Sequence, residues 1–340
     1  MSNNEAYVAG QPNISGRIRL SPEDFQVEED LGFEPDGAGE HVFLQVRKRN
    51  ANTEWLARQI ARVAGVRAGD VSYAGMKDRN AVTTQWFSVQ LPGREMPDWS
   101  PLLSDDVQLI TAVRNSRKLR RGALRGNRFV LVVRELSATS AELESRLRRI
   151  AAQGVPNYFG VQRFGHDAGN LDKAEALFNG TLKVRDRHVR GLYLSAARSH
   201  LFNQVLSQRV ATGTWNNALP GEALMLDGTH SVFVADSVDA TIEQRLTAFD
   251  VHPTGPLWGR GLSMARDQAL AVELAALMAY ETFKNGLEHA GMAQERRALR
   301  LPVADLAWQF PAAESVQLSF SLPAGAYATS VLRELVSVAE

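Results

Sequence analysis

The order of hydrophobic patterns along the 340 residues constrains the fold of this chain more than any other feature. Strand-like segments, either alternating or compactly apolar, occur at 17–20, 42–47, 84–91, 129–133 and 316–320. From Gly154 until the last of these strands, the pattern is mainly helical and is interrupted by turn-rich loops. Because strand segments on both sides enclose a mostly helical block, the sequence predicts a mixed α/β domain interrupted by an insertion.

The first helix is expected directly after the second strand segment. Asn52 and Thr53 are both suitable N-caps for it. Its apolar face is predicted to carry Trp55, Leu56, Ile60 and Val63. Such a helix has one apolar stripe and is expected to pack on a sheet.

Further helices and loops follow from spacing and turn residues. Thr139 and Glu142 have the spacing of a capping box at the start of a second helix. Helix-period apolar residues predict another helix at 270–277 and a closing helix at 328–338. Segments rich in proline, glycine and asparagine predict loops at 216–221 and 252–259.

The composition is that of an ordinary globular protein. With 44% hydrophobic residues the chain can bury substantial cores, and at roughly 150 residues per domain we expect two domains. Its 38 basic and 38 acidic side chains cancel, so any attraction to a nucleic acid must come from a local patch.

The chain contains no cysteine, which excludes disulfides, thiolate nucleophiles and thiolate metal sites and suits a reducing compartment. The segment from Met1 to Gln11 is polar, and no later window approaches about 18 consecutive apolar residues. We therefore expect a cytoplasmic protein that does not associate with membranes. A monomer is the default expectation.

A basic run between residues 114 and 128 is the clearest local charge patch. It contains no acid and seven cations: Arg114, Arg117, Lys118, Arg120, Arg121, Arg125 and Arg128. Gly122 and Gly126 within it allow backbone amides to approach phosphates closely. The run also suits a solvated surface, but the absence of acids favours RNA or DNA as its partner.

Several common catalytic motifs are absent. The seven histidines are scattered, and the chain has no H-E-x-x-H, no G-x-x-x-x-G-K-[ST] and no G-x-G-x-x-G. It also lacks the G-x-S-x-G motif of serine hydrolases. Neither a metal site nor a nucleotide cofactor is therefore expected.

A polar cluster at 73–80 carries the strongest candidate for catalysis. Asp78 lies between Lys77 and Arg79, and neighbouring positive charge favours an ionised carboxylate that serves as a base or nucleophile if partly buried. The same residues also suit a charged turn whose aspartate is screened by solvent. The local sequence leaves both interpretations open.

Gly75-Met76-Lys77-Asp78-Arg79, followed by Ala81-Val82-Thr83-Thr84-Gln85, resembles the catalytic signature of the TruD-type pseudouridine synthases. Four other segments resemble parts of this family in the expected order, at 21–29, 118–129, 156–165 and 322–334. The resemblance extends from about Arg17 to Glu334, which is nearly the whole chain.

The resemblance implies a pseudouridine-synthase catalytic domain of mixed α/β (α+β) character. This domain is expected to be discontinuous, at residues 1–152 and 302–340. A largely helical insertion domain specific to the family is expected at 153–301. The change of pattern at Gly154 agrees with this boundary.

The resemblance also implies an isomerase without cofactor or metal, with Asp78 as its catalytic group. Pseudouridylation breaks the C1′–N1 bond of uridine, turns the uracil and joins C1′ to C5. The aspartate either attacks C1′ or removes the C2′ proton, and the sequence does not separate these routes. Both routes require the uridine to leave its stack, which costs a few kcal/mol.

Three residues match positions that the family uses around the target base. Phe25 and Tyr327 are expected to stack on it, and Asn127 is expected to hydrogen-bond the uracil edge or the RNA backbone. Tyr327 departs from the phenylalanine common in the family, so a ring is retained and a hydroxyl is gained. On their own, the two aromatic residues would equally suit a hydrophobic core.

A cation is expected to pair with the catalytic carboxylate and hold it ionised. Arg19 is the residue that motif proximity suggests, and Lys77 and Arg79 are the alternatives. Lys77 is assigned to the substrate site in either case.

The usual substrate of the family is transfer RNA, and the bacterial target is the uridine at position 13. The resemblance therefore implies binding of tRNA without an obligatory protein partner. Phosphate contacts are predicted for Lys118, Arg120, Arg121 and Arg125.

Two other functions remain compatible with the sequence. A catalytically silent RNA-binding protein would use the same basic patch but not Asp78, and it would bind RNA without forming pseudouridine. A nucleoside or sugar hydrolase would need a second carboxylate as acid, and the motif supplies none nearby.

Overall fold

The computed structural model describes residues 5–137, 140–235 and 237–339. These residues form two compact units. Unit 1 falls within Met1–Pro12, Arg146–Pro302 and Tyr327–Leu335, and unit 2 falls within Asn13–Ser145, Val303–Ala326 and Val336–Glu340. The domain boundaries expected from the sequence remain a prediction, and unit 1 also includes two segments from outside the expected insertion.

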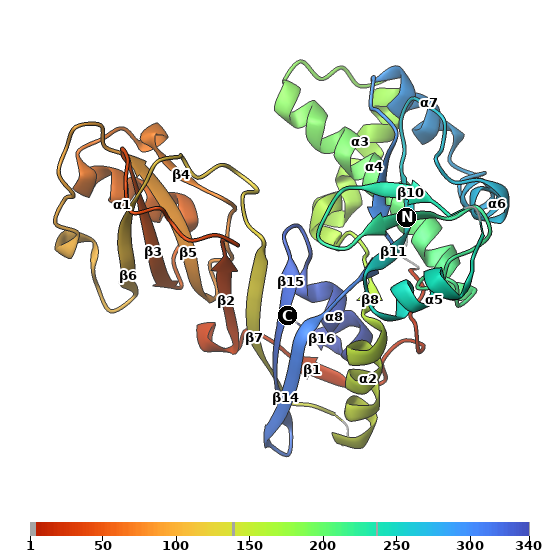
Figure 1. Ribbon diagram of the computed structural model, residues 1–340, viewed down its shortest axis with the longest axis horizontal. Coiled ribbons are helices and arrows are strands. Elements are labelled where there is room, and N and C mark those ends of the chain that lie inside the picture. The colour runs from red at the N-terminus through yellow and green to blue at the C-terminus, as the bar shows by residue number, and fades with distance from the viewer. Residues whose placement is uncertain (1–4, 138–139, 236, 340) are drawn as a thin grey trace. The chain divides into compact units, whose positions relative to one another are not determined.

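Unit 2 is built on a ten-stranded mixed sheet (Figure 1). Its strands are β1 (Ser15–Arg17), β2 (Phe25–Asp30), β3 (His41–Arg49), β4 (Val71–Tyr73), β5 (Val82–Gln90), β6 (Val107–Asn115), β7 (Gly126–Arg134), β14 (Ala304–Ala312), β15 (Ser315–Pro323) and β16 (Ser337–Ala339). The main path runs β14-β15-β7-β2-β5-β3-β6. β4 pairs with β5, and β1 joins β7 to β16. Neighbours are antiparallel except β2–β5 and β1–β16.

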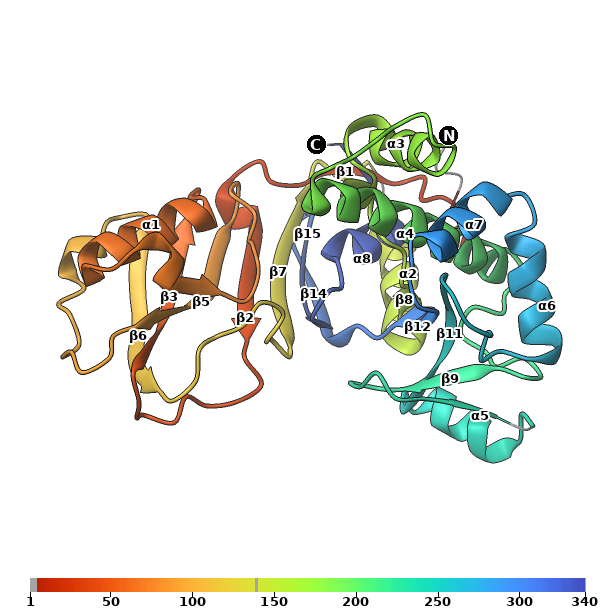
Figure 2. The ribbon, with the colours of Figure 1, turned by 90° about the horizontal axis from the view of Figure 1, so that it is seen from above.

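Helix α1 (Thr53–Ala64) covers one face of this sheet (Figure 2). Its N-cap is Asn52, whose side chain accepts hydrogen bonds from two amides of the first turn. The helix buries Leu56 and Ile60 together with three alanines, as the predicted amphipathic pattern requires. Trp55, expected on the buried face, is 41% exposed, because the alanines rather than the tryptophan extend the apolar stripe.

Unit 1 contains most of the helices. They are α3 (Gly169–Phe178), α4 (Arg187–Ala211), α5 (Ala240–Thr247), α6 (Asp267–Ala276), α7 (Glu281–His289) and α8 (Ala328–Leu335). α4 runs through the main hydrophobic core and buries Leu201, Phe202, Val205 and Leu206 completely. Helix α2 (Ser140–Gln153) contains the division between the units, and Thr139, its expected cap, lies outside the described residues.

Unit 1 also contains short strands that the sequence pattern did not reveal. They are β8 (Val155–Pro156), β9 (Ala223–Leu226), β10 (Val232–Val234), β11 (Val251–Leu257), β12 (Glu295–Ala298) and β13 (Arg300–Leu301). Four of them form a sheet in the order β10-β9-β11-β12, and β13 pairs with β8.

The loop predicted at 252–259 is wrong, because most of it is strand β11. This strand pairs first with β9 and then with β12. Its prolines lack an N–H but retain their carbonyl groups, and Pro253 O accepts a hydrogen bond from Leu299 N at 2.8 Å. The proline- and glycine-rich composition of this segment therefore suggested a loop, although its carbonyl groups still pair with a neighbouring chain segment.

Two predicted boundaries also differ from the structure. The strand expected at 17–20 ends at Arg17, because Arg19 adopts a left-handed conformation with φ of 58°. The closing helix expected to reach Val338 ends at Leu335. Ser337 instead donates its N–H to Ile14 O at 2.7 Å and begins strand β16.

A buried histidine makes the stability of unit 1 depend on pH. His200 on α4 is 5% exposed and contacts the rings of Phe164, Tyr280 and Phe283. Burial lowers its pKa from 6.5 to about 4, so the folded protein holds it neutral. Between these values the unfolded chain binds more protons than the folded protein, and the free energy of unfolding falls as the pH falls.

We predict that His200 costs about 2 kcal/mol of stability between pH 7 and pH 5. Urea unfolding should show this loss in the wild type and a shallower dependence on pH in His200→Phe. His188, an exposed residue of the same helix, provides the control His188→Phe, which should behave like the wild type. Identical pH dependence in all three proteins would contradict the assignment.

Candidate active site

The loop between β4 and β5 holds the predicted catalytic aspartate. Gln85 on β5 donates its amide to Gly75 O at 3.1 Å. Thr53 of α1 donates its hydroxyl to Gln85 Oε1 at 2.9 Å and accepts a hydrogen bond from Lys77 N at 3.1 Å. Because Thr53 and Gln85 are fully buried, these bonds fix the main chain of the loop to the helix and the sheet.

The carboxylate of Asp78 is half exposed and pairs with one cation. Arg19 Nη2 lies 2.9 Å from Asp78 Oδ2, and the side chain of Asp78 is 47% exposed. The Arg19 guanidinium lies 4.2 Å from the centroid of the Phe25 ring. Arg19 is thus held between an aromatic face and the carboxylate of Asp78.

Lys77 contacts a different carboxylate. Its amine forms a buried ion pair with Glu29 on β2, and Trp86 N donates to the second Glu29 oxygen at 2.7 Å. Burial raises the pKa of Glu29, while Lys77 acts in the opposite direction. The sequence offered three cations as partners of Asp78, and Arg19 is the one that pairs with it. Among the described residues, neither Lys77 nor Arg79 forms an ion pair with Asp78.

Lys48 is a buried neighbour of Asp78 that the sequence did not single out. Its amine donates to Ala51 O at 2.6 Å and to Asp78 O at 3.2 Å, and the residue is completely buried. Burial lowers the pKa of Lys48 to about 8, although the charge of Asp78 opposes this shift. The sequence signal for this burial is its position on β3, two residues after Val46 and on the same face as Val42 and Leu44.

Cross-strand register places several candidate residues on one face of the sheet. Glu29 on β2 is paired with Asn127 on β7, and Phe25 on the same face of β2 is 3% exposed. Phe129 is buried and contacts Phe25 edge-to-face at 6.5 Å between ring centroids. Asn127 Oδ1 is buried and accepts no hydrogen bond from any described residue. A buried amide oxygen without a hydrogen-bond donor is uncommon and calls for a partner, such as a ligand or a water molecule.

Tyr327 belongs to unit 1 and immediately precedes α8. Its hydroxyl accepts a hydrogen bond from Arg163 Nη2 at 3.3 Å. Arg163 also donates to Ser195 Oγ at 3.2 Å. The departure from phenylalanine therefore adds a polar contact within unit 1, and the stacking role of Tyr327 remains a prediction.

The predicted phosphate contacts lie on an exposed segment that is hydrogen-bonded to the loop between β4 and β5. This loop, residues 74–81, carries Asp78 and is the predicted catalytic loop. Lys118, Arg120, Arg121 and Arg125 are all exposed. Gly122 adopts a φ of 77° and donates its N–H to Ala74 O at 2.8 Å. Arg125 forms an ion pair with Asp30.

The chain matches the family model described as tRNA pseudouridine synthase D (TruD) over residues 1–173 and 168–335. It is 53% identical to the tRNA pseudouridine synthase D of Nitrosococcus oceani over 337 residues, which cover 98% of this chain and 94% of the relative. It is 52% identical to the protein of the same name from Methylococcus capsulatus over 327 residues, covering 96% and 92% of the two chains. The chain therefore belongs to the TruD family of tRNA pseudouridine synthases.

A solved structure shows the same fold. The crystal structure of a Methanosarcina mazei protein named for this family superposes with a TM-score of 0.77 at 21% identity, covering 97% of this chain and 95% of the other. The mixed α/β fold class expected from the sequence is confirmed. In the described parts of the chain, none of the helices combines the length and hydropathy needed to cross a bilayer.

We predict that removing the Lys77 amine destabilises the protein more than any ordinary surface change. Lys77→Met leaves the Glu29 carboxylate buried without its cation and should cost about 3–5 kcal/mol. Arg79→Met, two positions along the same loop, removes an exposed charge and should cost less than about 0.5 kcal/mol. Chemical denaturation of both variants measures the difference, and equal losses would show that the Lys77–Glu29 pair does not hold the loop.

Proposed function

We propose that this protein isomerises uridine to pseudouridine in transfer RNA, at position 13, with Asp78 as catalytic carboxylate and without a cofactor. The observation that carries the proposal is the half-exposed Asp78, paired with Arg19 at 2.9 Å in a chain of the TruD family. Its main chain is fixed by buried groups, whereas its carboxylate stays accessible to a substrate. The proposal includes a cytoplasmic location and action as a monomer.

The reaction requires a carboxylate that remains ionised until it acts. The half-exposed carboxylate of Asp78 is paired with Arg19 and is suited either to attack C1′ or to remove the C2′ proton. Breaking C1′–N1 and forming C1′–C5 transfers a proton from C5 and leaves N1 protonated. Substrate and product are isomers, so the balance calls for no external oxidant, reductant or energy source.

The surroundings of Asp78 suit an extruded nucleotide. Phe25 is covered by the Arg19 guanidinium in this structure, so we propose that Phe25 positions Arg19 and that the planar guanidinium offers a stacking surface to the base. Asn127 Oδ1 is a buried acceptor without a partner among the described residues and matches the N3–H donor of uracil. Tyr327 is proposed as a further stacking residue.

We predict that Asp78→Asn abolishes product formation. Purified wild type and variant should be incubated with unmodified tRNA without added cofactor, and pseudouridine should be mapped by carbodiimide-dependent reverse-transcription stops. The rate should fall by at least about 10³-fold, because an amide is neither a nucleophile nor a base of comparable strength. Asp105→Asn, at an exposed acid outside the site, should retain the wild-type rate.

The same assay tests the alternative of an RNA-binding protein without chemistry. If the wild type binds tRNA in a salt-sensitive manner but forms no pseudouridine in a full tRNA pool, the enzymatic proposal is wrong. Product at a uridine other than position 13 would retain the enzyme and correct its target.

We predict that Asn127→Leu lowers activity but not stability. The leucine removes the proposed acceptor for uracil, which should reduce kcat/KM by about 10- to 100-fold. It also replaces a buried oxygen that has no hydrogen-bond donor among the described residues, so the free energy of unfolding should stay equal or increase. Loss of stability with unchanged kcat/KM would assign Asn127 to the fold instead.

A further inference from the structure

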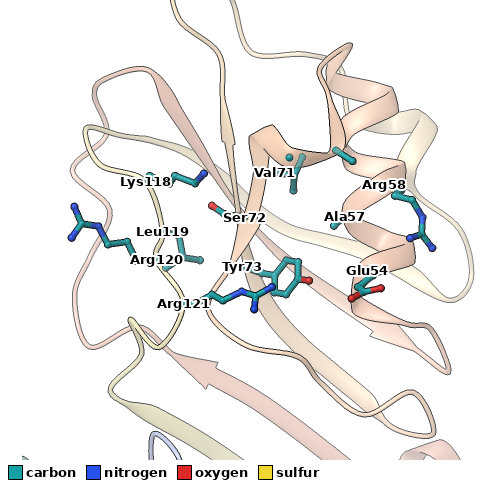
Figure 3. Close-up of a pocket in the computed structure, with 12 residues that line it drawn as sticks. Glu54, Ala57, Arg58, Val71, Ser72, Tyr73, Lys118, Leu119, Arg120 and Arg121 are labelled. Carbon is teal, nitrogen blue, oxygen red and sulfur yellow. The ribbon is translucent and has the colours of Figure 1, made fainter. Parts of the chain in front are cut away.

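A concave site in unit 2 is lined in part by β4, the strand that leads into the loop of Asp78, and Asp78 itself does not line it. The cavity has a volume of about 490 Å³, within the range of small-ligand pockets (Figure 3). Its walls come from α1, from strand β4 and from residues 118–121 of the basic run. β4 ends at Tyr73, where the catalytic loop begins, so the cavity and the loop share one strand.

The cavity is rimmed by cations. Arg58 projects from α1, and Lys118, Arg120 and Arg121 come from the basic run on the other side (Figure 3). In the described part of the chain, none of these four cations takes part in an ion pair. The one acid among the lining residues is Glu54. Four cations against one carboxylate on a concave surface favour the binding of an anionic group.

An aromatic ring stands next to these cations. Tyr73 lines the cavity, and the Arg121 guanidinium lies 5.9 Å from the centroid of its ring (Figure 3). The ring is supported by an edge-to-face contact with Phe87 at 6.0 Å, and the main chain of Tyr73 is paired with that same residue across β4 and β5. A supported aromatic face beside cations provides both elements of single-stranded RNA recognition, stacking and phosphate contact.

We propose that this cavity binds a second nucleotide of the RNA substrate, distinct from the uridine that reacts. Its phosphate contacts Arg58 on α1, its base stacks on Tyr73, and the cations of the opposite rim attract the adjoining RNA backbone. Tyr73 precedes Asp78 by five residues, so their Cα atoms lie within roughly 18 Å, a distance that one RNA can bridge. Extruding a uridine disturbs the stacking of its neighbours, and the cavity gives one of these displaced nucleotides a binding site.

The inference rests on the proposed function and deepens it. Arg58 and Tyr73 lie outside the basic run at 114–128, so the run by itself does not predict that they contact RNA. The cavity recognises the phosphate and base of a nucleotide, which is present both within RNA and as a free molecule. Titration with tRNA and with UMP separates these two sources.

The first experiment compares two arginines on the same helix. Arg58 and Arg62 are both exposed and lie four residues apart on α1, but only Arg58 lines the cavity. Each is changed to glutamine in an Asp78→Asn background, so that the tRNA is not altered, and tRNA affinity is measured by fluorescence anisotropy at several salt concentrations. Arg58→Gln should weaken binding about fivefold or more and reduce the salt slope by about one, whereas Arg62→Gln should stay within about twofold.

The second experiment tests the stacking surface. Tyr73→Phe keeps the ring and should retain tRNA affinity, whereas Tyr73→Leu should weaken it about fivefold or more. Thermal unfolding of both variants shows whether the contact with Phe87 has been preserved. If Tyr73→Leu does not fold, the Arg58 and Arg62 comparison still decides the proposal.

Titration with UMP separates free nucleotide from RNA. UMP binding to the wild type that is lost in Arg58→Gln, together with weaker tRNA binding by the same variant, supports the proposal. UMP binding that depends on Arg58 with no effect on tRNA assigns the cavity to a free nucleotide and overturns it, as does equal tRNA affinity of the Arg58 and Arg62 variants. Pseudouridine mapping on the wild type is a separate readout, so failure of the proposed function is recognised independently.

Discussion

The buried ion pair between Lys77 and Glu29 joins the catalytic loop to the centre of the large sheet. A charge pair in this position is costly to desolvate, and it is compensated only because Trp86 N completes the hydrogen bonding of Glu29. The loop cannot shift without exposing one charge to an apolar environment. Lys77 therefore anchors the loop, and the neighbouring Asp78 keeps a half-exposed carboxylate that pairs with Arg19.

The chemistry of the site is divided between main chain and side chain. Lys48 donates a hydrogen bond to the main-chain carbonyl group of Asp78, and Arg19 pairs with its carboxylate. Two cations therefore contact one residue through different atoms. Phe25 restrains Arg19 through its ring face. This arrangement orients the carboxylate before any ligand arrives, as the proposed catalytic role of Asp78 requires.

The sequence predicted the mixed fold class, helix α1 and the family, because these depend on local periodicity and ordered motifs. It suggested Arg19 as the cation beside Asp78 but could not decide between Arg19, Lys77 and Arg79, since Arg19 reaches Asp78 only through tertiary packing across 59 residues. Lys48 was overlooked because a lysine between two arginines resembles a surface residue, although its parity on the strand places it inside. The cavity at Arg58 was also hidden, because three separate segments, at 54–58, 68–73 and 118–121, form it. Strand β11 was not predicted because its two prolines and its glycine are typical of a loop.

The path of the chain has a consequence for how the protein is made. The chain passes between the two units five times, at residues 12/13, 145/146, 302/303, 326/327 and 335/336. Strands β14, β15 and β16, which complete the large sheet beside β7 and β1, are all synthesised last. At roughly 5–20 residues per second, the sheet edge at β7 therefore stays open on the ribosome for about 10–30 seconds before its closing strands are synthesised. Both units therefore receive segments that follow residue 302, and each is completed only after these segments have been synthesised.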